Sequence, residues 1–447
     1  MTLEPRAAAL QEAGIHTLLV QFTDLHGTPK GKLVPAAHLD EVLRTGAGFA
    51  GPSIAGTGLP RSGPRSEYYA RGDATTLQAL PWMPGVARIV GDGFVGGEPF
   101  EACPRQVLRR ALARLGARGW HLVTGIEPEF FLLQEGPSGW QAADPQDRLD
   151  KPSYDLKALG RQQGFLLELA QALQACGLDV QQIDHEDAHG QYELNFAHGP
   201  ALLSADRLML LKLGAHALAE RRGLVCSWMP KPFAEQPGSG LHLHVSLWRD
   251  GRNLFEADAS EAGLATGLSA LGRQFVAGVL AHAGALCALA APTVNSYKRL
   301  AAGASISGTT WSPTHAAHGP NNRTALVRTL PGRFEWRLPD ASANPYLVTA
   351  ALVAAGLDGI ERGLDPGAAC RDDLYERAAA GDGTPPDAAP LPRSLQESLQ
   401  ELRRDEVVLG ALGPQLANAF LALKDEEWRA WSSHVSAWEL ARYARAF

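Results

Sequence analysis

Residues 121–133 read HLVTGIEPEFFLL, an apolar run rich in β-branched and aromatic residues that carries two closely spaced glutamates. This composition favours a β-strand. Side chains at positions i and i+2 of a strand lie on one face, so Glu127 and Glu129 are expected to point the same way. The sequence thus predicts a strand that presents two carboxylates together.

Three further segments carry polar side chains at a similar spacing. LHLHVSLW at 241–248 and FEWRL at 334–338 read as strands, and HEDAHGQYE at 185–193 holds a His-Gly turn between two glutamates. The side chains expected to face one another from these segments are Glu186, Glu193, His242, His244, Ser246, Arg333, Glu335 and Arg337. Each segment alone could be an exposed strand or a surface ladder of ion pairs. Together they predict a cavity in which Mg²⁺ or Mn²⁺ lies beside guanidinium groups, as phosphoryl transfer requires.

The composition limits the partners and the compartment. The chain has 447 residues, a formal net charge of −7 and 45% hydrophobic residues, which is enough for a large core and, by length, for two domains. The mild acidity argues against nucleic acid and against a membrane surface as partners. Five scattered cysteines and no signal-peptide pattern predict a cytoplasmic protein. The uncharged stretch at 276–294 is expected to form a buried helix.

The order of predicted elements divides the chain near residue 100. Residues 15–35 form two β-rich runs around a D-L-H-G turn and predict a hairpin, whereas the Gly- and Pro-rich stretch from 46 to 72 is weakly patterned. The Pro-flanked joint PFEACPRQ at 99–106 is the predicted boundary, and a helix is expected to begin within it. We therefore expect one domain at residues 1–100 and a second at residues 101–447.

The motifs occur in an order that is typical of a known family. Besides EPEFF, HEDAHGQYE and the GSGLHLH run, the chain contains NSYKR, NNRTALVR, RFEWRLPD and SANPYL. In this set and order it resembles the glutamine synthetase family over nearly its whole length, from FAGPSIAG near residue 50 to the C-terminal helices. The resemblance implies an α+β fold, in which a β-grasp-like N-terminal domain precedes a larger catalytic domain with a curved antiparallel sheet and outer helices.

The resemblance also implies roles for individual residues. It places ATP and two or three Mg²⁺ or Mn²⁺ ions in each active site. One ion would be held by Glu129, Glu186 and Glu193, and another by Glu127, His242 and Glu335. The other matching positions are Arg299, Arg337, Arg323 and the Gly238 backbone for glutamate, Arg323, Arg328 and Arg333 for the phosphates, and His244 and Ser246 for the nucleotide. Of these, Arg323 and Arg328 would also act in catalysis.

Three positions depart from the family's ammonia-using members. Ala50 in FAGPSI replaces an aspartate that helps to bind and deprotonate ammonium across a subunit interface, and Ser305 replaces a glutamate that covers the site. Pro237 stands where an asparagine is usual. The loss of two carboxylates makes the pocket larger and less polar, which favours an alkylammonium ion over ammonium. Glu67, expected in a loop beyond FAGPSIAG, is the candidate base for the amine.

The remaining pattern resembles type III glutamate–ammonia ligases, a subgroup that includes γ-glutamylmethylamide synthetases. The implied reaction is ATP-dependent ligation of L-glutamate to a small primary amine, methylamine first, through γ-glutamyl phosphate. Ammonia-dependent glutamine synthesis, ligation to polyamines or ethanolamine, and an inactive nitrogen-responsive relative are the alternatives. The resemblance further implies a homo-dodecamer with shared active sites, in which Ala50 and Glu67 would serve a neighbouring subunit. Tyr375 matches a position that is adenylylated in some members, although a helix-end tyrosine is the simpler interpretation.

Overall fold

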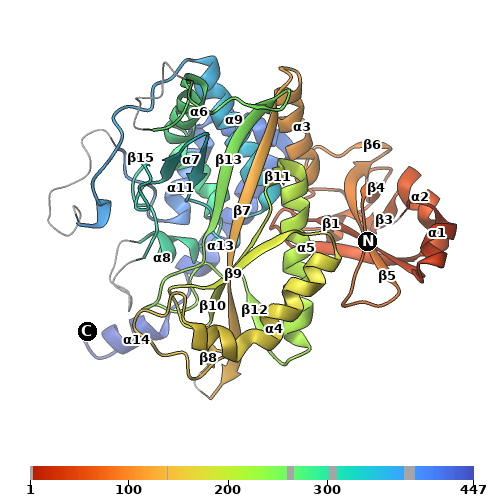
Figure 1. Ribbon diagram of the computed structural model, residues 1–447, viewed down its shortest axis with the longest axis horizontal. Coiled ribbons are helices and arrows are strands. Elements are labelled where there is room, and N and C mark those ends of the chain that lie inside the picture. Colours follow the sequence, from red (N-terminus) through yellow and green to blue (C-terminus); the bar gives the residue numbers. More distant parts are fainter. Residues whose placement is uncertain (1–3, 138, 259–265, 302–309, 377–387) are drawn as a thin grey trace.

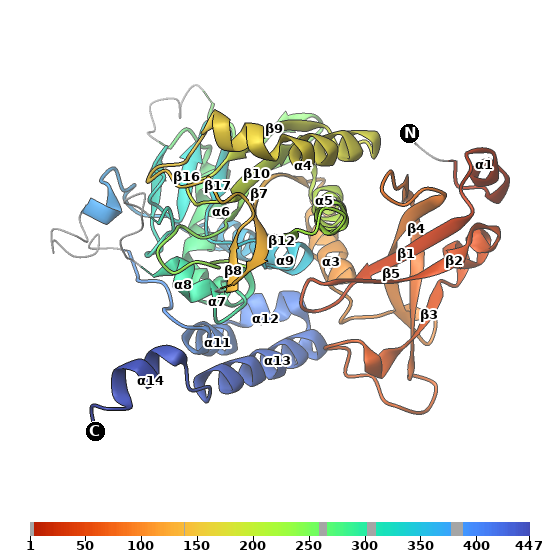
Figure 2. The same ribbon diagram turned by 90° about the horizontal axis from the view of Figure 1, so that it is seen from below.

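The computed structural model describes residues 4–137, 139–258, 266–301, 310–376 and 388–447, and these form two β-sheets with helices packed around the larger one (Figure 1). The larger sheet curves, and its helices lie on the outside (Figure 2). The prediction of an α+β fold with a small N-terminal sheet is therefore confirmed. The two sheets lie on either side of residue 100, and the division into domains at that point stays a prediction.

The smaller sheet is built from the N-terminal part of the chain. Its strands are β1 (Thr17–Thr23), β2 (Pro29–Pro35), β3 (Ala47–Ala50), β4 (Glu67–Ala79), β5 (Val86–Val95) and β6 (Glu98–Pro99), beside the helices α1 (Ala7–Glu12) and α2 (Leu39–Arg44). The strand order is β2-β1-β5-β4-β3, with β6 on β5. β1 and β2 pair antiparallel, so the predicted hairpin is confirmed, and β1 pairs parallel with β5.

The weakly patterned stretch from 46 to 72 holds more regular structure than its sequence indicated. β3 and the start of β4 lie within it and pair antiparallel, with Ala50 opposite Glu67. Glycines interrupt the alternation of apolar and polar residues there, and the two strands meet only because a long loop returns the chain. Such non-local pairing leaves little trace in a short sequence window.

The larger sheet carries the predicted polar strands next to one another. Its main path runs β15 (His318–Pro320), β16 (Val327–Leu330), β17 (Arg333–Trp336), β13 (Leu241–Arg249), β7 (His121–Gly136), β10 (Gln191–Phe196) and β9 (Val180–His185). Short strands β8 (Gly139–Ala142), β11 (Gly199–Pro200), β12 (Val225–Ser227) and β14 (Arg252–Asn253) pair at its margins. All of these pairs are antiparallel except β15 with β16. The long strands β7 and β13 form its centre (Figure 1).

The rest of the larger part is helical, and some of its helices pack on the sheet whereas others pack on one another. The helices are α3 (Pro104–Gly116), α4 (Leu156–Ala175), α5 (Ala201–Glu220), α6 (Ala270–Ala281), α7 (Ala283–Ala290), α8 (Ser296–Leu300), α9 (Pro345–Glu361), α11 (Leu395–Arg404), α12 (Glu406–Leu412), α13 (Pro414–Ser432) and α14 (Ala437–Tyr443). α9 is buried along almost its whole length. A helix that is apolar on all sides, as α9 is, lies inside a core.

The prediction of one buried helix over 276–294 is wrong in its continuity. α6 and α7 are both largely buried, but they meet at His282 with a bend of 76°. His282 lies between the two helices, and its imidazole contacts Asp405 at 2.7 Å and Asp358 at 3.0 Å. Among the described helices, none alone is long and apolar enough to cross a membrane; two bent pairs, α6 with α7 and α12 with the helices after it, meet the criterion only when joined.

An ionic cluster joins the smaller sheet to the larger part of the molecule. Arg105 of α3 is buried and contacts Asp73, Asp92 and Asp206 at 2.9, 2.9 and 2.8 Å. The hydroxyl of Tyr346 donates to Asp206 at 2.7 Å. These partners belong to β4, β5, α5 and α9, so the cluster fixes the smaller sheet beside α3 and α5 (Figure 2).

Candidate active site

A cavity of about 520 Å³ opens on the larger sheet, where the predicted polar strands lie side by side. Strand register brings the ligands together, since Glu129 pairs with Glu193, and Glu127 with His242. The predicted residues that line this cavity are Glu127, Glu129, Glu186, Glu193, Gly238, His242, Arg299, Arg323, Arg328, Glu335 and Arg337. All six expected metal ligands therefore face one space.

Within the described ranges of the chain, no positively charged side chain forms an ion pair with Glu186 or Glu193 at the β9–β10 side. The Gly240 amide and the Gln191 side chain each donate to Glu129 Oε2 at 2.8 Å. Burial, together with the carboxylate of Glu129, raises the pKa of Glu186 to about 8, and burial beside Glu186 raises the pKa of Glu193 well above its ordinary value. Buried carboxylates that repel one another in this way are suited to a divalent cation, which would supply the missing positive charge.

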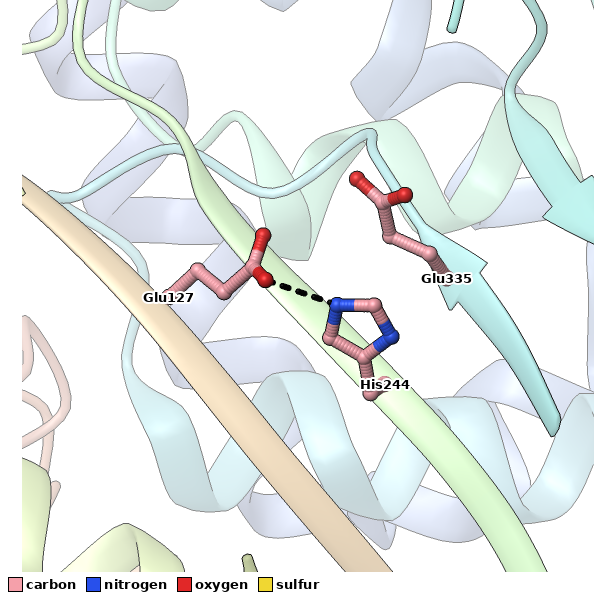
Figure 3. A group of neighbouring side chains, drawn as sticks. All are labelled: Glu127, His244 and Glu335. Carbon is pink, nitrogen blue, oxygen red and sulfur yellow. Dashed lines mark hydrogen bonds and ion pairs between the residues drawn. The ribbon is translucent and has the colours of Figure 1, made fainter. Parts of the chain in front are cut away.

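The second set of ligands meets at the β7, β13 and β17 strands. His242 Nδ1 lies 3.5 Å from Glu127 Oε2 and 3.5 Å from Glu335 Oε1. His244 Nε2 lies 2.8 Å from Glu127, and Figure 3 shows Glu127, His244 and Glu335 turned toward one another. The potential ligand atoms of Glu127, His244 and Glu335 lie within 4.8 Å of one another, as do those of Glu127, Glu193 and His242. His244, expected beside the nucleotide, is thus also close enough to serve as a metal ligand.

Positive charge lies along the opposite wall. Arg328 Nη1 contacts Glu335 Oε2 at 2.8 Å, and Arg337 contacts the other oxygen of Glu335. Burial alone would raise the pKa of Glu335, but Arg337 and His242 outweigh it and lower the pKa to about 2. Arg299 is buried and donates to the backbone carbonyls of Leu338 and Arg337 at 2.9 and 3.2 Å. These guanidinium groups are positioned to bind anions such as carboxylates and phosphates.

Two glycines give the cavity its shape. A Cβ on Gly238 would lie 2.3 Å from the carbonyl oxygen of Pro230, so no side chain fits there. A Cβ on Gly240 would lie 2.9 Å from Glu129 Oε1, 2.9 Å from His242 Nε2 and 3.1 Å from Arg299 Nη2. The empty volume at Gly240 therefore lies among groups from both ligand sets and the arginine wall.

A second cavity of about 410 Å³ adjoins the first, and Glu127 lines both. The expected nucleotide contacts His244, Ser246 and Arg333 line this second cavity and do not line the first. Arg333 Nε donates to His244 Nδ1 at 3.3 Å, and the indole of Trp248 donates to Ser246 Oγ at 2.9 Å. β17, which carries Arg333 and Glu335, thus contributes to both cavities.

Two predicted residues do not reach either cavity of their own chain. Ala50 and Glu67 line a separate surface hollow on the smaller sheet. The expectation that Glu67 lies in a loop is wrong, because it is the first residue of β4 and its carboxylate accepts a hydrogen bond from the Tyr69 hydroxyl at 2.7 Å. Ser305 lies outside the residues that the structure describes. The Tyr375 hydroxyl donates to the carbonyl of Ser312 at 2.8 Å, and burial raises its pKa to about 12.

The cavity also has residues that the sequence patterns did not single out. They are Ser153, Tyr154, Gln182, Asp184, Asp187, Thr310 and Trp311. Asp187 directly follows Glu186 and could have been included in the acidic segment. Tyr154 and Trp311 have φ angles of 64° and 54°, which bulky residues seldom adopt and which no composition pattern predicts.

Comparisons with known proteins agree with this geometry. The family model described as glutamine synthetase, catalytic domain, matches residues 101–443. A protein of Methyloversatilis universalis named glutamate–methylamine ligase is 48% identical over 441 residues, which cover 98% of each chain. A glutamine synthetase of Rhizobium meliloti is 39% identical over 443 residues, also with 98% of each chain covered.

Solved structures show the same likeness. A structure titled GmaS/ADP complex, conformation 1, superposes with a TM-score of 0.91 at 41% identity, and covers 99% of this chain and 100% of that one. A structure titled apo GmaS without ligand gives a TM-score of 0.89, with 98% and 99% covered. The chain belongs to the glutamine synthetase family, and it is an ATP-dependent ligase that uses a divalent metal.

Proposed function

We propose that this enzyme joins L-glutamate to a small primary amine, methylamine above all, and hydrolyses one ATP to ADP and phosphate in each cycle. The observation that carries this proposal is the set of six ligands, four of them buried, that face four arginines in one cavity, beside a second cavity that shares Glu127. The similarity to a relative named glutamate–methylamine ligase favours methylamine as the amine.

The cavity residues would have separate roles in substrate binding and in the two chemical steps. Arg299, Arg337 and the Gly238 backbone would bind glutamate, and His244, Ser246 and Arg333 would bind the nucleotide. In the first step, a γ-carboxylate oxygen attacks the γ-phosphorus of ATP, the bond to ADP breaks, and γ-glutamyl phosphate forms. Arg323 and Arg328 would neutralise charge that moves onto the transferred oxygens. In the second step, the amine nitrogen attacks the carbonyl carbon of the γ-glutamyl phosphate, phosphate leaves, and the amine loses a proton.

The ligand sets fit two divalent cations, and a third could be held with the help of the ATP phosphates. Glu129, Glu186 and Glu193 would hold one ion, and Glu127, His242 and Glu335 another. When bound, such ions would supply positive charge that screens the repulsion between two anionic substrates. The raised pKa values of Glu186 and Glu193 support this assignment, since desolvation and neighbouring carboxylates raise both, and no described residue forms an ion pair with either.

We further propose that the enzyme is a dodecamer in which neighbouring chains share active sites. Ala50 and Glu67 line a surface hollow rather than the cavity of their own chain, so they would act only on a neighbour's site. Glu67 would then be the base for the amine. Mixing Glu67→Ala with Glu129→Ala chains should restore part of the activity that each variant lacks. No restoration in mixed oligomers, with both variants assembled, would refute the shared site.

Isotope transfer tests the reaction itself. Glutamate labelled with ¹⁸O in its γ-carboxylate is incubated with the enzyme, Mg²⁺, ATP and methylamine, and the phosphate is analysed by mass spectrometry. One ¹⁸O atom should appear in phosphate for each γ-glutamylmethylamide formed, because the γ-carboxylate oxygen leaves with phosphorus. Phosphate without ¹⁸O, or ADP formation that does not depend on glutamate, would reject the proposed reaction.

A further inference from the structure

One end of the main cavity is aromatic and acidic at the same time. Asp187 is only 7% exposed, and its two carboxylate oxygens accept hydrogen bonds from different loops. The hydroxyl of Ser153 donates to Oδ1 at 2.8 Å, and the indole nitrogen of Trp311 donates to Oδ2 at 2.9 Å. Tyr154 lines the same end of the cavity, next to Ser153. Asp187 therefore joins the two loops that carry these rings.

This end lies on the glutamate side of the cavity. Arg337, an expected glutamate contact, donates to the backbone carbonyl of Trp311 at 3.1 Å. Neither Trp311, Tyr154 nor Asp187 lines the adjoining cavity that holds the expected nucleotide contacts. A molecule bound against Trp311 would thus be near the glutamate and away from the nucleotide.

The two rings are held where other residues would fit the backbone more easily. Both Trp311 and Tyr154 have a left-handed φ, in which glycine or asparagine is less strained. Their side chains are nevertheless 41% and 69% exposed, so burial in a core does not hold them there. Strain of this kind at a cavity is typical of a functional site.

We propose that Trp311, Tyr154 and Asp187 form the subsite for the amine, with Trp311 as the residue that selects a primary alkylammonium ion over ammonium. This inference deepens the proposed function and rests on it. The N–H groups of the alkylammonium would donate to the second lone pairs of the Asp187 oxygens. The methyl group and its share of the positive charge would lie against the faces of the two rings. Ammonium has no methyl group to bury and is more strongly hydrated, so it gains less from the rings.

Steady-state rates of a small set of variants test the subsite. Trp311→Ala removes the ring, Trp311→Phe keeps a ring but removes the N–H group, and Tyr154→Ala removes the second ring. Trp140→Ala is the matched control, because Trp140 is also exposed, at 57%, and lies on β8 outside both cavities. Each enzyme is assayed with methylamine, ethylamine and ammonium at saturating ATP and glutamate, and the KM for glutamate is measured separately.

Trp311→Ala should raise the KM for methylamine about tenfold, which corresponds to about 1.4 kcal/mol. It should leave the KM for glutamate and for ammonium within about twofold, and it should reduce the preference for methylamine over ethylamine because the pocket widens. Trp311→Phe and Tyr154→Ala should have smaller effects, and Trp140→Ala none. Equal losses with methylamine and ammonium, or a matching rise in the KM for glutamate, would show a structural role and overturn the proposal.

Direct binding separates this inference from the proposed function. Saturation-transfer NMR follows the methyl protons of methylammonium with the enzyme, glutamate, Mg²⁺ and a non-hydrolysable ATP analogue. Wild type and Trp140→Ala should show equal transfer, and Trp311→Ala should show clearly less at the same methylammonium concentration. If transfer depends on Trp311 but the enzyme forms no amide, the proposed function is refuted and the amine subsite is supported. Amide formation with transfer that is absent, or equal in all variants, would refute the subsite.

Discussion

Gly240→Ala should lower kcat/KM by at least about tenfold while leaving the enzyme folded. The φ of Gly240 is not left-handed, so alanine can adopt its backbone conformation. The added methyl group would lie 2.9 Å from Glu129 Oε1 and from His242 Nε2, and 3.1 Å from Arg299 Nη2. All three atoms are ends of flexible side chains, which can retreat. We therefore expect the free energy of unfolding to change by less than about 1 kcal/mol, below the usual effect of overpacking.

The effect on catalysis follows from how far the side chains must move. Ordinary contact with a Cβ begins at 3.4 Å, so the atoms of Glu129 and His242 must each retreat by about 0.5 Å. Metal–ligand distances tolerate only about 0.2 Å, and a misplacement of about 1 Å costs on the order of 100-fold in rate. Because one residue of each ligand set and a glutamate contact move together, kcat/KM should fall between about tenfold and 100-fold.

The assay is phosphate release at increasing Mg²⁺, with Mn²⁺ affinity measured by electron paramagnetic resonance and stability by urea unfolding. Gly164→Ala is the control, because a Cβ on that α4 glycine meets no atom within 4 Å. Gly164→Ala should keep wild-type rates. A Gly240→Ala enzyme with wild-type kcat/KM and metal affinity would refute the placement of Gly240 between the ligand sets. Unfolding of the variant would refute the claim that the side chains can retreat.

Three other variants probe single groups. Arg337→Ala should raise the KM for glutamate at least tenfold while the KM for ATP changes little; an unchanged glutamate KM in initial-rate assays would reject that contact. His282→Gln should lower the free energy of unfolding by about 2 kcal/mol near pH 6. Hydrogen bonds to Asp405 and Asp358 raise the pKa of His282 despite burial, so its contribution is complete below the ordinary value of 6.5 and is lost as the pH rises through the raised value. Urea unfolding from pH 6 to 9 should show the difference shrink, and growth with pH would contradict it. Arg105→Leu should cost about 4 kcal/mol in urea unfolding, because it leaves buried carboxylates unpaired, whereas a loss below about 1 kcal/mol would contradict the role of the cluster.

The sequence predicted the active-site strands better than it predicted the rest. Strand geometry alone placed Glu127 with Glu129 on one face, and the structure adds that register sets Glu193 and His242 opposite them. Such positions are predictable because the i, i+2 spacing depends only on local backbone geometry. The bend at His282 was missed, because its acidic partners, Asp358 of α9 and Asp405 directly before α12, are distant in sequence.

The aromatic end of the cavity could not be predicted for the same reason. Tyr154 and Trp311 are far apart in the chain and outside any strand or helix pattern, and Asp187 links their loops through hydrogen bonds from Ser153 and Trp311. The position of Glu67 was misjudged because pairing of β3 with β4 is non-local. Functional positions on strands were thus accessible from periodicity, whereas those on loops depended on tertiary contacts.

A competition experiment tests the central claim most directly. The enzyme is supplied with Mg²⁺, ATP, L-glutamate and equal concentrations of methylammonium and ammonium, and the products are quantified by mass spectrometry at early times. Since the product ratio equals the ratio of the two kcat/KM values at equal concentrations, it needs no knowledge of enzyme activity or assembly. We predict γ-glutamylmethylamide in large excess over glutamine. Glutamine as the main product would contradict the assignment of methylamine as the substrate.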